Sequence, residues 1–151
     1  MTVYIVNQQE LHARTEGPEQ APVALLIHGW SSSWYTWTPL MPILSRRFHC
    51  IAVDLPGYGR SPALLQRPTI ARYTDLIAGL IQQVSERAVL ILGHSMGGQI
   101  AMTIALRYPM LLERMVLLNP SVSGCLSTFI NVLVTPQILL ERFRWGAQFL
   151  S

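Results

Sequence analysis

Lysine is absent from this chain of 151 residues, and charges of either sign are few: charged residues make up 13% of the sequence and hydrophobic residues 50%. So little charge with so much apolar material excludes a disordered tail, a collagen-like repeat and a charged coiled coil. A chain of this length buries roughly two-thirds of the surface that its unfolded form exposes, which is enough for a core without disulfides. We therefore expect one compact domain.

Cysteine is scarce as well. Cys50 and Cys125 lie far apart, show no C-x-x-C spacing, and Cys50 stands inside the apolar run 48–53. Both are interpreted as buried free thiols, a habit of cytoplasmic proteins. The first residues, 1–7, lack the charged region, the long apolar region and the cleavage site of a secretory signal. We expect a cytoplasmic protein.

The basic residues, 11 in number, are all arginine and face eight acidic residues. Apart from Arg46 and Arg47, and Arg142 and Arg144, they are scattered along the chain, which indicates a solvated surface and no nucleic-acid partner. No pair of histidines or carboxylates shows the spacing of metal ligands. We therefore expect neither a metal nor an organic cofactor.

Residues 115–140 carry no charge at all. Pro120, Gly124 and Pro136 interrupt this stretch, so it contains no uninterrupted apolar segment of about 18 residues that would span a membrane. Two short helices separated by Pro136 fit the pattern better, and they need a partner surface. Attachment of residues 126–150 to the face of a membrane is an alternative that uses the same side chains.

Short apolar runs alternate with helical patterns along most of the chain, which predicts the α/β class with a mostly parallel sheet and flanking helices. The expected strands cover residues 2–6, 9–15, 23–27, 48–53, 88–92 and 115–118. The expected helices cover residues 38–45, 70–84 and 96–108. The first two strands are expected to form a hairpin.

The most specific motif is Gly93-His94-Ser95-Met96-Gly97-Gly98, which matches G-x-S-x-G between a predicted strand and a predicted helix. A serine on so sharp a turn has a strained backbone, and the flanking chain leaves no room for side chains at Gly93 and Gly97. Ser95 then lies at the N-terminus of a helix, where backbone N–H groups favour a developing negative charge. The alternative is an ordinary glycine-rich turn.

Two further motifs follow predicted strands: His28-Gly29-Trp30, and the loop 54–61 with the sequence DLPGYGRS. Together the three motifs resemble the α/β-hydrolase family over about residues 2–121. The resemblance implies that Ser95 is the nucleophile and that the backbone N–H groups of Trp30 and Met96 form an oxyanion hole. It assigns a structural role to Gly29, Gly93, Gly97, Gly98 and Asp54.

A serine at position 95 limits the reactions that the site can perform. It implies an acyl-enzyme route, hence a small-molecule acyl substrate such as an ester, thioester or amide, and a carboxylesterase-like activity. Dehalogenation and epoxide opening are disfavoured, because enzymes of this family that perform them look to an aspartate nucleophile.

A serine nucleophile also needs a general base, normally a histidine oriented by a carboxylate. The family order is serine, acid, histidine, yet no histidine follows His94, and the carboxylates after Ser95 are Glu113 and Glu141. Glu113 is expected at the opposite end of the sheet from Ser95. The side chain of His94 should point away from its neighbour Ser95.

The other three histidines are not expected to act as the base. His28 is expected to pack against, or hydrogen-bond to, the loop that it begins. His12 and His49 are expected on strands of the sheet.

These gaps predict a chain truncated before the last strands of the fold. Residues 1–121 would form the N-terminal part of the core and residues 122–151 the beginning of a helical cap. The edge of the strand 115–118 would then be unpaired, which predicts self-association through that edge and the apolar tail. Two functions stay open: a serine hydrolase that is incomplete here, or a non-catalytic binding protein that uses the same scaffold.

Overall fold

The computed structural model describes residues 1–122, of which Met1–Pro120 form one compact unit. One sheet runs through this unit in the strand order β1-β2-β4-β3-β5-β6. Its strands are β1 (Thr2–Val6), β2 (Gln9–Glu16), β3 (Val23–Ile27), β4 (His49–Val53), β5 (Val89–His94) and β6 (Leu112–Leu118). The pairs β4–β3, β3–β5 and β5–β6 are parallel, whereas β1–β2 and β2–β4 are antiparallel. The predicted α/β class and the predicted hairpin are confirmed.

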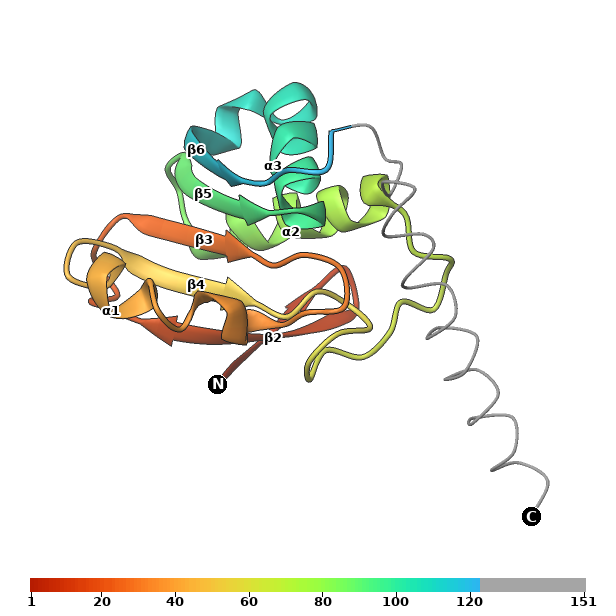
Figure 1. Cartoon of the computed structure of the whole chain (residues 1–151), viewed down its shortest axis with the longest axis horizontal. Coiled ribbons are helices and arrows are strands. Elements are labelled where there is room, and N and C mark those ends of the chain that lie inside the picture. The colour runs from red at the N-terminus through yellow and green to blue at the C-terminus, as the bar shows by residue number, and fades with distance from the viewer. Residues whose placement is uncertain (123–151) are drawn as a thin grey trace, which may run out of the picture. The chain divides into compact units, whose positions relative to one another are not determined.

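Helices cover both faces of the sheet, with α2 and α3 on one side and α1 on the other (Figure 1). Their bounds are η1 (Trp34–Trp37), α1 (Met41–Leu44), α2 (Ile70–Val84), α3 (Met96–Arg107) and η2 (Pro109–Leu111). Strand side chains alternate between the two faces. Leu25 packs in the core beneath α2 and α3, whereas the next residue, Leu26, packs with Trp37 and Met41 on the other face.

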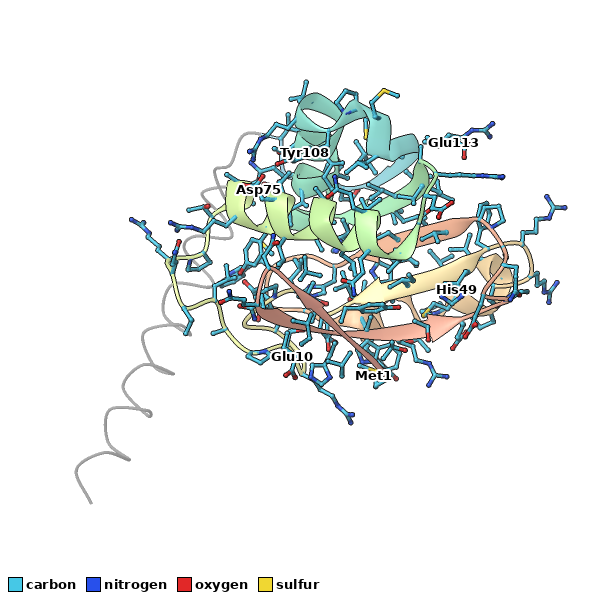
Figure 2. The ribbon with its side chains drawn as sticks, turned by 180° about the vertical axis from the view of Figure 1, so that it is seen from behind. Met1, Glu10, His49, Asp75, Tyr108 and Glu113 are labelled. Atoms are coloured by element: carbon cyan, nitrogen blue, oxygen red, sulfur yellow. The ribbon has the colours of Figure 1, made fainter. Side chains whose placement is uncertain are left out.

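The long helix α2 follows the sequence prediction closely. Its N-terminus is capped by Thr69, whose side-chain oxygen accepts a hydrogen bond from the backbone N–H of Arg72 at 3.2 Å. Tyr108, the residue after α3, donates a hydrogen bond of 2.8 Å to a carboxylate oxygen of Asp75 in α2. The guanidinium of Arg107, the last residue of α3, lies 2.7 Å from the same oxygen. Figure 2 shows Asp75 and Tyr108 side by side, so these polar contacts fasten α3 to α2 over the sheet.

Two elements differ from the predictions. The helix expected over residues 38–45 is shorter than predicted: only α1, Met41–Leu44, forms in that range, and η1 precedes it. A proline is tolerated only in the first turn of a helix, so Pro42 places the start at Met41. The strand expected at 115–118 begins earlier, at Leu112, so Glu113 lies inside β6. An irregularity in the pairing between Val89 and Leu90 accommodates this longer strand.

Strand β6 forms one edge of the sheet, and within residues 1–122 it pairs with β5 alone. Met115, Val116 and Leu118 are 41%, 45% and 38% exposed there. The predicted cap, the apolar tail and Cys125 lie outside the described residues, apart from Val122. Among the helices of the described part, none has the length and apolar character needed to cross a bilayer. Cys50 is buried as a free thiol, and burial raises its pKa to about 11.

Candidate active site

The loops that follow β3, β4 and β5 meet at the carboxyl edge of the parallel strands (Figure 1). In open α/β sheets this edge is where ligands bind. The three loops carry the three motifs that the sequence singles out, at residues 28–30, 54–61 and 93–98. Strands far apart in the sequence therefore bring these motifs into one place.

Ser95 stands between the last residue of β5 and the first of α3, with φ 52° and ψ −114°. This backbone conformation is strained for a residue with a side chain. Backbone hydrogen bonds hold it on both sides. The N–H of Ser95 donates to the carbonyl oxygen of Leu118 at 3.0 Å, and its own carbonyl oxygen accepts from the N–H groups of Gly98 at 3.0 Å and Gln99 at 3.2 Å. The surrounding structure thus fixes the turn from both sides.

The glycines around Ser95 mark places where two backbones touch. A Cβ atom on Gly93 would lie 2.5 Å from the carbonyl oxygen of Gly97, and a Cβ atom on Gly97 would overlap the carbonyl oxygen of Ile27 at the end of β3. A Cβ atom on Gly98 would lie 2.8 Å from the side chain of Pro120. Only glycine allows the start of α3 to lie this close to the strands.

The loop after β3 touches the same turn. A Cβ atom on Gly29 would lie 3.0 Å from Cβ of Ser95 and 3.1 Å from Nδ1 of His94. Among the backbone hydrogen bonds of residues 1–122 outside regular elements, none is donated by the N–H of Trp30 or Met96. Met96 opens α3, where a helix leaves its first N–H groups without intrahelical acceptors. Trp30, the residue after Gly29, is 43% exposed.

Asp54 is completely buried and both of its carboxylate oxygens are engaged. One accepts a hydrogen bond of 2.7 Å from the N–H of Trp34, and the other accepts one of 3.0 Å from the N–H of Arg60. Gly59, at φ 55°, lies against this carboxylate, where a Cβ atom would overlap it. Asp54 therefore ties the loop 54–61 to the segment after β3, and both of its carboxylate oxygens bind backbone N–H groups there.

His28 is also completely buried, and both ring nitrogens have protein partners. Nδ1 lies 2.6 Å from the carbonyl oxygen of Gly29, and Nε2 lies 3.0 Å from the backbone N–H of Leu55. Burial lowers the pKa of His28, and this outweighs the opposite effects of the Gly29 carbonyl and of Asp54. The ring is neutral and fully used, so the expectation that it hydrogen-bonds to its own loop is confirmed.

The remaining histidines do not reach Ser95 either. Nδ1 of His94 is buried with no hydrogen-bond partner among the described residues. His12 pairs with Glu10 at 2.6 Å. His49 and Glu113 lie at the edge where the parallel strands begin, opposite to the edge that carries Ser95 (Figure 2). Within residues 1–122 no histidine or carboxylate side chain makes a hydrogen bond to Ser95, and Glu141 lies outside them.

A cavity of about 360 Å³ lies away from this turn. Its walls come from the β1–β2 turn (residues 7–9), the loop 64–66 and α2, and they include none of the motif residues. The described residues also hold no cluster of three or more metal-ligating side chains.

Comparison with known proteins matches residues 22–150 to the family described as alpha/beta hydrolase fold. The chain belongs to the alpha/beta hydrolase family. The resemblance that the three motifs predict is thereby confirmed.

Two curated relatives and two solved structures illustrate the family match. The AB hydrolase superfamily protein YfhM of Bacillus subtilis is 32% identical over 116 residues, covering 75% of this chain and 41% of that protein. The (E)-2-((N-methylformamido)methylene)succinate hydrolase of Acinetobacter baylyi is 31% identical over 118 residues, covering 78% and 44%. The chain thus spans about two-fifths of the length of these relatives.

Among solved structures, a membrane phospholipase A described as a bacterial virulence factor superimposes with a TM-score of 0.75 at 28% identity, covering 79% of this chain and 39% of that one. A deformylase acting on N-formylmaleamic acid, from Pseudomonas putida, superimposes with a TM-score of 0.73 at 28% identity, covering 82% and 48%. This alpha/beta hydrolase therefore shares the fold of hydrolases with different named substrates.

The glycine contacts predict a ranking of two alanine substitutions. Gly97→Ala forces a side chain into backbone, so we expect it to lower the free energy of unfolding by about 3 kcal/mol or more, or to prevent folding. Gly57→Ala meets nothing closer than 3.9 Å but stands at φ 86°, so we expect a loss of only about 1–2 kcal/mol. Urea denaturation of both variants gives the comparison, and equal losses would contradict the assigned contact.

Burial of His28 predicts a loss of stability in acid. Because the folded pKa lies below the ordinary value of 6.5, the unfolded chain binds more protons than the folded one below that pH. The stabilising contribution of the neutral ring is complete above about pH 6.5 and declines as the pH falls through the folded pKa. Denaturation at pH 7.5 and 5.5 should show that the wild type loses more stability than His28→Asn; equal losses would exclude this role.

Proposed function

We propose that Ser95 is the nucleophile of a serine hydrolase that cleaves an ester-like acyl substrate. The observation that carries this proposal is the turn itself: a serine at φ 52° between β5 and α3, whose glycine neighbours bring it against the end of β3. A structure that keeps strain of this kind normally uses it to expose a reacting group.

The N–H groups of Trp30 and Met96 are the proposed oxyanion hole. Both belong to the two loops that meet at Ser95, and neither donates to a backbone acceptor outside the regular elements of the described part. Backbone donors that are fixed before the reaction stabilise a developing oxyanion strongly, and losing one costs about 10²–10³ in kcat in known hydrolases.

The proposed reaction has two halves. Oγ of Ser95 attacks the acyl carbon and loses its proton to a general base, and the carbonyl oxygen becomes an oxyanion held by the two N–H groups. The intermediate collapses to the acyl-enzyme as the leaving group departs with a proton, and water then releases the acid. In this proposal residues 1–122 supply the nucleophile and the N–H groups, and none of their histidine or carboxylate side chains is hydrogen-bonded to Ser95.

Three of the similar proteins have names that support an acyl substrate without fixing its identity. One is named for hydrolysis of a formamido-succinate, one for removing a formyl group and one as a phospholipase A. These names have acyl-group cleavage in common, which is the chemistry that a serine nucleophile performs. Trp30 follows Gly29, which lies against Ser95, and its exposed indole adds apolar surface to this loop.

A thiol at position 95 tests the site without needing a base of its own. A cysteine at a helix N-terminus has a lowered pKa, whereas one at a helix C-terminus does not. We expect Ser95→Cys, at the start of α3, to be acylated by p-nitrophenyl butyrate at pH 7 at least tenfold faster than Ser85→Cys, at the end of α2.

Both variants are made in a Cys125→Ser background, so that Cys125 cannot be acylated. Cys50 is left unchanged because it is buried. Mass spectrometry locates the acyl group. Equal rates at the two positions, or acylation elsewhere, would contradict the proposed site.

One observation favours a second candidate function, a non-catalytic binding protein: the apolar edge of β6 is open within the described part of the chain. An unpaired strand edge is a template for pairing with another chain. In this reading two copies associate through β6, and Ser95 stays unreactive.

Sedimentation velocity at increasing concentration tests this candidate. We expect the unchanged chain to self-associate, and Val116→Lys, which places a charge on the open edge, to shift it toward monomer. Leu106→Lys, a matched change on α3 where the side chain is 83% exposed, should have no effect. A chain that stays monomeric, or an equal response to both changes, would exclude association through β6.

A further inference from the structure

His28 bridges two backbone groups of opposite character. Its Nδ1 faces a carbonyl oxygen, that of Gly29, so Nδ1 must carry the proton and donate. Its Nε2 faces an N–H group, that of Leu55, so Nε2 must be the acceptor. Because a neutral imidazole has one nitrogen of each kind, the two partners select a single tautomer.

The bond to Gly29 has a consequence for the next residue. The peptide group is planar and trans, so the C=O of Gly29 and the N–H of Trp30 belong to one rigid unit and point in opposite directions. Anchoring the carbonyl oxygen on His28 therefore fixes the direction of the Trp30 N–H. Gly29 itself lies against Ser95.

We propose that His28 is a positioning residue, which holds the Gly29–Trp30 peptide in the orientation that presents the Trp30 N–H to the acyl group on Ser95. This inference rests on the proposed function, because it assigns a task to one of the two oxyanion donors. His28 touches no reacting atom and acts through the peptide alone.

The other end of the ring is held firmly as well. Leu55 follows Asp54, whose carboxylate is fixed by the N–H groups of Trp34 and Arg60. The N–H of Leu55 is thus a stationary donor, and an edge-to-face contact with Tyr58, with ring centroids 5.4 Å apart, restrains the imidazole further. Complete burial of His28 keeps water from competing for either nitrogen. A chain of bonds therefore runs from the Asp54 loop to the Trp30 N–H.

The unchanged chain offers the first test, which needs no variant and no activity. Two-bond ¹H–¹⁵N correlation spectra of the imidazoles report which nitrogen carries the proton. We expect His28 to show the Nδ1–H tautomer at pH 7.5. A proton on Nε2 would overturn the proposal.

Two isosteric variants separate positioning from simple packing. The amide nitrogen of His28→Asn sits close to the position of Nδ1 and can still donate to Gly29, whereas the amide of His28→Gln reaches the position of Nε2 and cannot. In the backbone amide spectrum we expect the Trp30 resonance to shift in His28→Gln and to stay near its wild-type position in His28→Asn. His49→Asn, at the far end of β4, is the matched control and should leave it unchanged.

The kinetic readout uses the Ser95→Cys background. With p-nitrophenyl butyrate we expect His28→Gln to lower the limiting acylation rate about 10- to 100-fold, because a misdirected donor is lost in the transition state, with the half-saturating ester concentration unchanged. His28→Asn should retain the rate within about threefold. Equal losses in both variants, with both still folded, would reduce His28 to a packing role and overturn the proposal.

Failure of the proposed function has a different signature. If Ser95→Cys reacts no faster than Ser85→Cys, then the nucleophile assignment is wrong, while the tautomer of His28 and the Trp30 resonance still report on the peptide. If Ser95→Cys reacts fast and neither histidine variant changes rate or resonance, then only the positioning role is wrong.

Discussion

The contact between Gly97 and the carbonyl oxygens of Ile27 and His28 is the constraint on which the site depends. Because no side chain separates them, the first turn of α3 rests directly on the end of β3. That approach fixes where β5 must turn, and so it sets the strained backbone of Ser95. It also brings the loop after β3 against the same turn. The lack of a side chain at Gly97 therefore determines the positions of Ser95 and of the N–H groups of Trp30 and Met96.

Buried polar groups then make this edge of the sheet rigid. His28 and Asp54 are both fully buried, and every ring nitrogen and carboxylate oxygen of the two is hydrogen-bonded to backbone, once within its own loop and once in another segment. A buried polar network costs free energy when a group in it lacks a hydrogen-bond partner, and it restricts the conformations of its loops when every group has one. Because all of these atoms of His28 and Asp54 bind backbone groups, the two side chains hold the loops at the carboxyl edge and are not assigned a part in proton transfer.

Local pattern was enough to predict most elements and the turn at Ser95, because apolar runs, helical spacing and the Gly93-to-Gly98 motif are properties of adjacent residues. It was not enough for the start of β6, where Leu112 pairs with Val89. The break before α1 does have a local cause in Pro42, which the helix predicted over 38–45 did not take into account. The tautomer of His28 could not be predicted either, since it depends on the N–H of Leu55, 27 positions away. Contacts between distant segments carry no local signal.

The groups of the proposed site also differ in whether neighbouring or distant segments of the chain supply them. Ser95 and the N–H of Met96 are presented by β5, its turn and α3, whereas the N–H of Trp30 comes from the separate loop after β3. In the proposed reaction a general base must also approach Ser95. Each histidine of the described residues is either hydrogen-bonded to another group, without a hydrogen-bond partner or at the opposite edge. In the proposed reaction, the described part therefore holds the acyl group and its negative charge, and it offers no side chain hydrogen-bonded to Ser95 that would move the proton.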